Sequence, residues 1–212
     1  CDHTNHSRDS FFVMTYSESA KDAHHHLTKL GPKKLSEFIE SVGPIDIPVR
    51  YGDDLLLGLS RIVVGQQLSN QAARSIWEQL VTQYPQRSKL IDALKNSETP
   101  NTGLSASKKR TLSDLTHRGD HWIQTIATQS EAKRREVLLE VWGLGPWSVA
   151  MWELFVLRNP NQWSDKDLIL RRLSIVFANE LGEDAGEFVE RASPFRSYLA
   201  LYCWRFNDQN RY

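Results

Sequence analysis

The sequence predicts an all-α protein, and three observations lead to this. From about residue 18 onward apolar residues recur with helical spacing, and no alternation typical of strands persists. Gly-Pro pairs at 31–32 and 43–44 separate the first helical segments. A length of 212 residues with 40% apolar residues suits one ordinary domain, or two small lobes that share a core.

The helices are expected to follow one another with short connections. Ser69 and Ser105 are suited to cap helix N-termini, because a serine side chain accepts a hydrogen bond from a free amide of the first turn. Gly119 is suited to end the segment that Ser105 begins. The expected helices span 19–29, 33–42, 53–65, 69–84, 88–96, 105–119, 120–128, 130–141, 147–158, 166–181, 184–191 and 195–206.

The charge balance excludes a polycation that binds nucleic acid by bulk charge. Lys and Arg together number 26, as do Asp and Glu, so the formal net charge is zero. A local basic face stays open, because it depends on where the charges lie. The two cysteines, Cys1 and Cys203, are too few for a disulfide framework or for four thiolates around an iron–sulfur cluster. Cys203 lies in an apolar stretch and is expected to be a buried, inert thiol.

The first 17 residues are expected to form a mobile tail, and residues 18–212 a single domain. The chain opens on Cys1, which would suit a lipidated N-terminus or, more simply, a boundary upstream of a start at Met14. The adjacent histidines 24–26 cannot face one site on a helix, so they predict a solvated run and no metal site. No stretch approaches the roughly 20 apolar residues that a membrane span needs.

A glycine hairpin stands between two helical patterns at 141–148, with the sequence VWGLGPWS. Gly143 and Gly145 leave their backbone amides bare, and Pro146 suits the first turn of the helix that follows. Bare amides beside a helix N-terminus form a phosphate site. The segment therefore predicts a helix–hairpin–helix grip on a nucleic-acid backbone, with an ordinary glycine connection as the alternative.

Asp167 begins the helical pattern that follows the loop at 159–162. With Ser164 it forms a capping-box-like pattern, so one role for Asp167 is helix capping. The other role is a carboxylate at the mouth of a cleft, held near a helix N-terminus.

Gln66 and Gln67 stand side by side at a turn that follows an apolar helix and precedes Ser69. Such a pair is hard to place in a core. The two side chains are either surface residues or a polar wedge that fills a hole in a base stack.

These segments resemble the helix–hairpin–helix DNA glycosylase superfamily, and within it the alkylpurine (3-methyladenine) DNA glycosylase II branch. The resemblance covers roughly residues 27–206. It rests on VVGQQLSNQAA (63–73), GLSASKKRTL (103–112), LLEVWGLGPWSVAMW (138–152), DKDLILRR (165–172) and SPFRSYLALYCW (193–204). It implies a two-lobed helical fold with the cleft between the lobes, and without the N-terminal β domain of the larger bacterial members.

The resemblance also assigns roles to residues. Asp167 takes the catalytic position, and Asp165 is a weaker substitute. Trp147 stands where the endonuclease III-like branch carries the lysine that forms a Schiff base, so no abasic-site lyase activity is expected. The implied base pocket comprises Trp147, Trp204, Met151 and Leu168. The implied DNA-binding residues are Gln66, Gln67, Ser69, Gly143, Leu144, Gly145, Ser148 and Arg172.

The implied function is that of a monofunctional enzyme of base excision repair. It would flip alkylated purines such as 3-methyladenine and 7-methylguanine out of duplex DNA and hydrolyse their N-glycosidic bonds. No cofactor or metal is expected, apart from a monovalent cation that the hairpin carbonyls could hold. A monomer, intracellular and chromosome-associated, is expected. The alternatives are a deaminated or oxidised base as substrate, or a non-catalytic DNA-binding protein.

Two features stay undecided. Trp77, Trp122 and Trp152 are expected in the core, but Trp142 and Trp163 fit either core or site. Residues 105–135 hold seven basic residues against three acidic ones, which could face phosphates or form a solvated helix surface. The basic residues are Lys108, Lys109, Arg110, Arg118, Lys133, Arg134 and Arg135.

Overall fold

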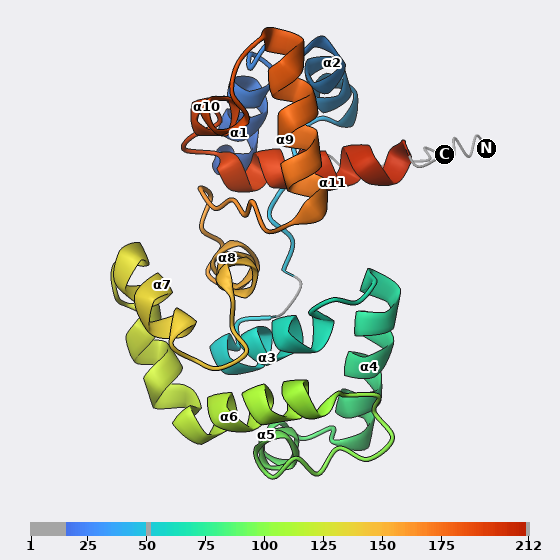
Figure 1. Ribbon diagram of the computed structural model, residues 1–212, viewed down its shortest axis with the longest axis vertical. Helices are drawn as coiled ribbons and strands as arrows, with labels where there is room; N and C mark the ends of the chain where they lie inside the picture. The colour runs from blue at the N-terminus through green and yellow to red at the C-terminus, as the bar shows by residue number, and fades with distance from the viewer. Residues whose placement is uncertain (1–15, 50–51, 211–212) are drawn as a thin grey trace, which may run out of the picture.

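The computed structural model describes residues 16–49 and 52–210, and this part of the chain contains eleven helices and no strand (Figure 1). The all-α prediction is confirmed. The helices are α1 (Glu18–Leu27), α2 (Lys33–Val42), α3 (Leu55–Gly65), α4 (Asn70–Gln83), α5 (Arg87–Lys95), α6 (Ala106–Ala127), α7 (Glu131–Leu139), α8 (Pro146–Phe155), α9 (Leu168–Leu181), α10 (Ala185–Arg191) and α11 (Arg196–Gln209).

The expected tail falls almost entirely outside the described residues, which begin at Tyr16. Its last residue, Ser17, belongs to the folded part, because its side chain accepts a hydrogen bond from the amide of Ala20 and caps α1. The backbone amide of Ser17 also donates to Asp46 Oδ1 at 3.2 Å. The folded chain therefore starts at least one residue before the expected boundary at residue 18.

The helices form two lobes, as Figure 1 shows. Helices α1, α2, α9, α10 and α11 pack together in one lobe, and α3 to α7 form the other. Helix α8 lies between them and contacts α3 and α7. The first lobe is assembled from both ends of the sequence, so the chain crosses between the lobes once before α3 and once after α8.

Side chains of the expected type fix the helix ends. Ser69 caps α4 and Ser105 caps α6, each accepting a hydrogen bond from an amide of the first turn, as predicted. Gly119 is not helical, with φ 77° and ψ −175°, and it separates two helical segments that meet at a kink within α6. The prediction that Gly119 ends the segment begun by Ser105, and that a second helix follows it, is confirmed.

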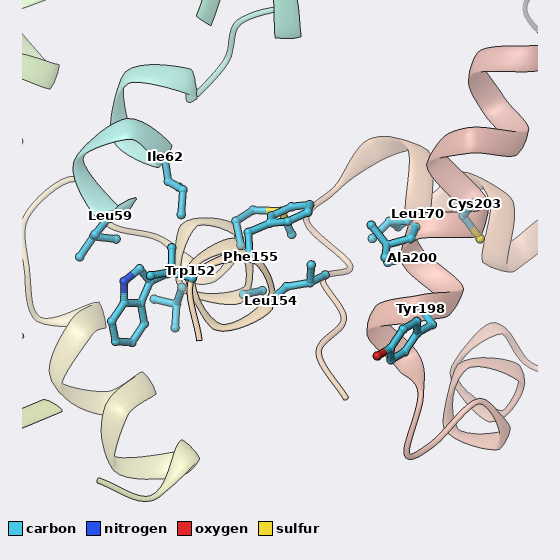
Figure 2. Packing of buried hydrophobic residues seen from close by; sticks show 14 of the residues in the cluster. Leu59, Ile62, Trp152, Leu154, Phe155, Leu170, Tyr198, Ala200 and Cys203 are labelled. Atoms are coloured by element: carbon cyan, nitrogen blue, oxygen red, sulfur yellow. The ribbon is translucent and has the colours of Figure 1, made fainter. Parts of the chain in front are cut away.

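Helix α8 carries apolar residues on all sides because it packs against both lobes. Figure 2 shows Phe155 and Leu154 of α8 between Ile62 of α3 and Leu170 of α9. Trp152 is fully buried, and its indole nitrogen donates to the carbonyl of Leu55 at 3.1 Å. A single hydrophobic cluster thus runs through α8 from one lobe into the other.

Two of the three tryptophans predicted to lie in the core do so, and the third does not. Trp77 and Trp152 lie in the core, as predicted. Trp122 is only half-buried at the edge of the core, with the guanidinium of Arg118 5.0 Å from its ring centroid. Trp163 is half-buried, and its indole nitrogen donates to Asp165 at 2.9 Å.

A buried ion pair joins α7 to α8 across the hairpin between them. Arg134 Nε lies 2.6 Å from Glu153 Oε1, and Arg134 Nη2 lies 2.9 Å from Oε2, so the contact is bidentate. The Glu153 side chain is 1% exposed. Removing Arg134 would leave the buried carboxylate of Glu153 without a charge partner, so this pair constrains the angle between the two hairpin helices.

A second ionic cluster links α3, α5 and α6. Arg87 contacts the carboxylates of Asp54 and Asp120, the latter at 2.6 Å. Burial alone would raise the pKa of Asp54. The hydrogen bonds from Arg87 and from the amides of Leu57 and Leu56, together with the positive charge of Arg87, outweigh burial and lower that pKa.

The adjacent histidines point to separate partners. His25 Nε2 lies 2.6 Å from the amine of Lys29, and His26 Nε2 lies 2.8 Å from the carbonyl of Arg191. Within the described ranges no group of three or more His, Cys, Asp or Glu could hold a metal ion. No helix in these ranges has the length and apolar character that crossing a bilayer requires.

Candidate active site and nucleic-acid interface

Asp167 caps α9 through its own side chain. Its Oδ1 accepts hydrogen bonds from the amides of Ile169 and Leu170, both at 3.1 Å. The expected capping role is confirmed in a different form, since Ser164 contributes its backbone carbonyl, which accepts from the Asp167 amide. The carboxylate therefore sits at the positive end of the helix dipole with its position fixed.

Two indole nitrogens complete the surroundings of this carboxylate. Trp147 Nε1, from α8, donates to Oδ2 at 3.1 Å, and Trp204 Nε1, from α11, donates to Oδ1 at 3.2 Å. Asp167 thus receives four N–H donors, three on Oδ1 and one on Oδ2. Because Oδ2 has a single donor, it keeps acceptor capacity for another group, such as a water molecule.

The sequence prediction brought Asp167, Trp147 and Trp204 together correctly but missed what the tryptophans do there. Trp204 stacks on Phe155 with ring centroids 5.8 Å apart and planes 22° apart, so one of its faces is covered. Their indole edges, rather than their faces, contact the carboxylate. The residue type alone could not distinguish these two uses of an indole ring.

The other expected pocket residues differ in exposure. Met151 is 4% exposed and belongs to the core of α8. Leu168, which follows Asp167, is 74% exposed. Cys203 is fully buried, and burial raises the pKa of its thiol, with the negative charge of Asp167 adding to the effect. The thiol is therefore protonated and unreactive at neutral pH, as predicted.

The hairpin before α8 is held close to α6. Gly143 takes φ 84° and is exposed, and a Cβ built on it would lie 2.0 Å from Thr111 Oγ1. Gly145 precedes Pro146 at the N-terminus of α8, and no side chain caps this end. The Leu144 side chain is 7% exposed and packs in the core, so this residue can offer only its backbone to a ligand.

Gln66 ties the end of α3 to the hairpin. Its Nε2 donates to the carbonyl of Gly143 at 2.9 Å and to Ser148 Oγ at 2.8 Å. Ser148 is 2% exposed, so its hydroxyl is a support inside the protein and not a surface contact. Gln67 is exposed and takes φ 56°, which directs it differently from its neighbour. The structure therefore distinguishes the roles of the two glutamines, which the sequence left open: Gln66 supports the hairpin, and Gln67 is exposed.

Lys108 supports the same turn from α6, a contact that the sequence did not reveal. Its Nζ donates to the carbonyl of Val64 at 2.7 Å, at the C-terminus of α3. Burial lowers the pKa of this amine. A lysine at a helix C-terminus also interacts favourably with the helix dipole.

Most of the basic residues between 105 and 135 have partners inside the protein. Arg118 pairs with Asp114, Lys133 with Glu136 and Arg134 with Glu153, while Lys108 binds the end of α3. Arg110 lies over the ring of Trp142 at 4.2 Å from its centroid. Five of these seven basic side chains therefore have a partner within the protein, and four of the five bind a carboxylate or a backbone carbonyl.

Arg172 also has a partner within its own lobe. Its Nη2 donates to Asn207 Oδ1 at 2.5 Å and so links α9 to α11. The residue is exposed, and the remaining N–H groups of its guanidinium can still reach a ligand.

Comparison with solved structures identifies the fold. The 3-methyladenine DNA glycosylase of Schizosaccharomyces pombe, solved in complex with abasic DNA, aligns with a TM-score of 0.73 at 20% identity over 90% of this chain and 98% of its own. The Bacillus halodurans DNA-3-methyladenine glycosidase gives 0.67 at 18% identity, over 86% and 88%. The Archaeoglobus fulgidus 3-methyladenine DNA glycosylase gives 0.65 at 16%, over 92% and 77%.

No protein-family model matches the sequence, and no curated protein matches it either. The chain nevertheless has the helical fold of 3-methyladenine DNA glycosylases. The fold that the sequence motifs predicted is thus confirmed by structural likeness.

Proposed function

We propose that the chain is a monofunctional DNA glycosylase that releases alkylated purines from duplex DNA. One observation carries the proposal: Asp167 is held by two capping amides and two indole N–H groups where α8, α9 and α11 meet. The structural neighbours, which are named for removing 3-methyladenine, support the substrate class. The substrates proposed are 3-methyladenine and 7-methylguanine.

The reaction needs little from the protein beyond this carboxylate. Alkylation at N3 or N7 places positive charge on the purine and weakens its glycosidic bond. When the C1′–N9 bond breaks, its electron pair leaves with the base and neutralises it, and the sugar becomes oxocarbenium-like. The negative charge of Asp167 stabilises that cation, and Oδ2 accepts the proton of the water whose oxygen adds to C1′.

The absence of a lysine at position 147 supports hydrolysis without lyase chemistry. An indole cannot form a Schiff base with C1′, so Trp147 leaves water as the nucleophile. A cationic purine stacked on an indole face gains about 0.5–2 kcal/mol. Because Phe155 covers one face of Trp204, only the other face of that ring is open to a base.

The DNA backbone would be held by the bare amides at the N-terminus of α8, next to Gly143 and Gly145. Gln67 is the proposed wedge, because it is exposed while the amide nitrogen of Gln66 is bound to the hairpin. The chain would act as a monomer without a cofactor. A monovalent cation on the hairpin carbonyls would add to the backbone grip without taking part in the reaction.

The experiment compares base release from methylated duplex DNA by wild type, Asp167→Asn and Asp165→Asn. Asparagine still caps a helix, so Asp167→Asn should fold and bind DNA but lose at least about 100-fold in base release. Asp165 is exposed and binds only Trp163 among the described contacts, so Asp165→Asn is the matched control and should keep its activity.

Two outcomes would redirect the assignment. If wild type binds DNA but releases neither methylated purine, a panel of deaminated and oxidised bases separates another glycosylase from a non-catalytic binder. If Asp167→Asn keeps full activity, the carboxylate is only a helix cap and the proposed chemistry is wrong.

A further inference from the structure

Arg110 and Trp142 form a stacked pair directly beside the glycine hairpin. The guanidinium carbon of Arg110 lies 4.2 Å from the ring centroid of Trp142, and 45% of the Trp142 surface is exposed. Trp142 immediately precedes Gly143, which approaches Thr111, the residue after Arg110, more closely than a side chain would allow. Each member of the pair is therefore next in sequence to one of the two residues, Gly143 and Thr111, that hold the hairpin against α6.

Arg110 differs from the other stacked arginine of α6. Arg118 also lies over a tryptophan, but it pairs with Asp114 at 3.3 Å. No carboxylate within the described residues pairs with Arg110. Its guanidinium is held in place by the ring, keeps its charge uncompensated, and is exposed. Arginine stacks on aromatic faces and is well suited to bind phosphate groups.

We propose that the Arg110–Trp142 pair binds a second phosphate of the DNA backbone, next to the phosphate held by the hairpin amides. A guanidinium binds phosphate oxygens through two parallel N–H groups, and stacking on the ring fixes the plane from which they point. The inference rests on the proposed function, because it requires the hairpin to face DNA. It also gives a role to the exposed tryptophan that the sequence left undecided.

The test measures how DNA affinity depends on salt. Each phosphate that a protein neutralises contributes about 0.9 to the slope of log affinity against log salt concentration. For Arg110→Gln the slope should fall by about 0.9, so its affinity ratio to wild type should change about 3.5-fold when salt rises fourfold. The probe is a short duplex with a tetrahydrofuran abasic site, which the enzyme cannot process.

Arg118→Gln is the matched control, because it removes a stacked arginine from the same helix at a position away from the hairpin. Its salt slope should equal that of wild type. Trp142→Ala keeps the charge but releases the guanidinium. It should weaken binding by about 2- to 10-fold, because the released side chain must be immobilised again when it binds the phosphate, with the slope unchanged.

Three results would overturn the inference. An unchanged slope in Arg110→Gln would show that this residue is solvated surface. An equal fall in both arginine variants would show a general charge effect and no local contact. Wild type that does not bind DNA would overturn the proposed function as well, whereas wild type that binds without releasing any base leaves this measurement valid and counts against the catalytic proposal alone.

Discussion

Replacing Gly143 by alanine tests whether the hairpin is fixed by its close approach to α6. The new Cβ would lie 2.0 Å from Thr111 Oγ1, so either the hairpin or α6 must move. Overpacking of this kind costs about 1–3 kcal/mol. The φ of 84° adds roughly 1–2 kcal/mol for any residue with a side chain. We expect Gly143→Ala to lower the free energy of unfolding by about 2–5 kcal/mol.

Thermal unfolding measures this effect, at about 2–4 °C of melting temperature per kcal/mol for a chain of this size. A second substitution separates the two causes. Thr111→Ala removes Oγ1 and Cγ2 but keeps Cβ, 3.1 Å from the new side chain, so it should restore most of the contact part of the loss in Gly143→Ala but leave the backbone strain. Base release should fall in Gly143→Ala, because the hairpin is displaced, and should recover when Thr111→Ala is added.

Gly119→Ala is the control for strain alone. Gly119 has a φ of 77°, but a Cβ there would meet nothing within 4 Å. It should therefore cost about 1–3 kcal/mol, and Thr111→Ala should not relieve that cost. The reasoning is refuted if Gly143→Ala unfolds at the wild-type temperature, or if Thr111→Ala rescues neither stability nor base release.

Three further predictions follow from the contacts described. Trp147→Phe keeps an aromatic face but removes the N–H on Asp167, so base release should fall about 10- to 100-fold in single-turnover assays, while DNA affinity changes little. Glu153→Gln leaves the partly exposed guanidinium of Arg134 without its charge partner and should destabilise the fold by about 1–3 kcal/mol in denaturant unfolding. Asp54→Asn should destabilise the protein at neutral pH. Because the folded pKa of Asp54 lies below its ordinary value of 3.8, that stabilisation is complete above this pH and is lost as the pH falls through the folded pKa. The difference in melting temperature from wild type should therefore close below about pH 4, and a constant difference down to pH 2 would contradict the ion pair with Arg87.

The helices were predictable because their signals are local. Apolar spacing located the helices, and the side chains of Ser69 and Ser105 cap as their positions predicted. Gly119 was recognised as a break between two helical segments, but the sequence could not show the direction that the second segment takes. That direction depends on packing against other helices, among them α3, which α4 and α5 separate from α6 along the chain.

The candidate catalytic residues were predictable for another reason: they resemble a known pattern. The same pattern placed Trp147 and Trp204 in the pocket but gave no information on which edge of each ring faces Asp167. It also assigned Met151 and Leu168 to one pocket, although one is buried and the other is exposed. Orientation and exposure arise from the packing of three helices, which no single segment specifies.

The contacts that support the site could not be predicted from the sequence, which singled out Gln66 only as a surface residue or a wedge. Gln66 reaches a carbonyl 77 residues away, and Arg134 reaches Glu153 across the hairpin. Each of these residues belongs to a type that is common on protein surfaces, so no composition or spacing distinguishes it from a solvated side chain. The hairpin, by contrast, was recognised because glycine is rare inside helical patterns. It follows that substitutions at the recognised residues test the chemistry. Substitutions at Gln66, Thr111 and Glu153 test whether the contacts between helices keep the hairpin and Asp167 in position. Both kinds of substitution are needed to show that base release depends on this arrangement of helices.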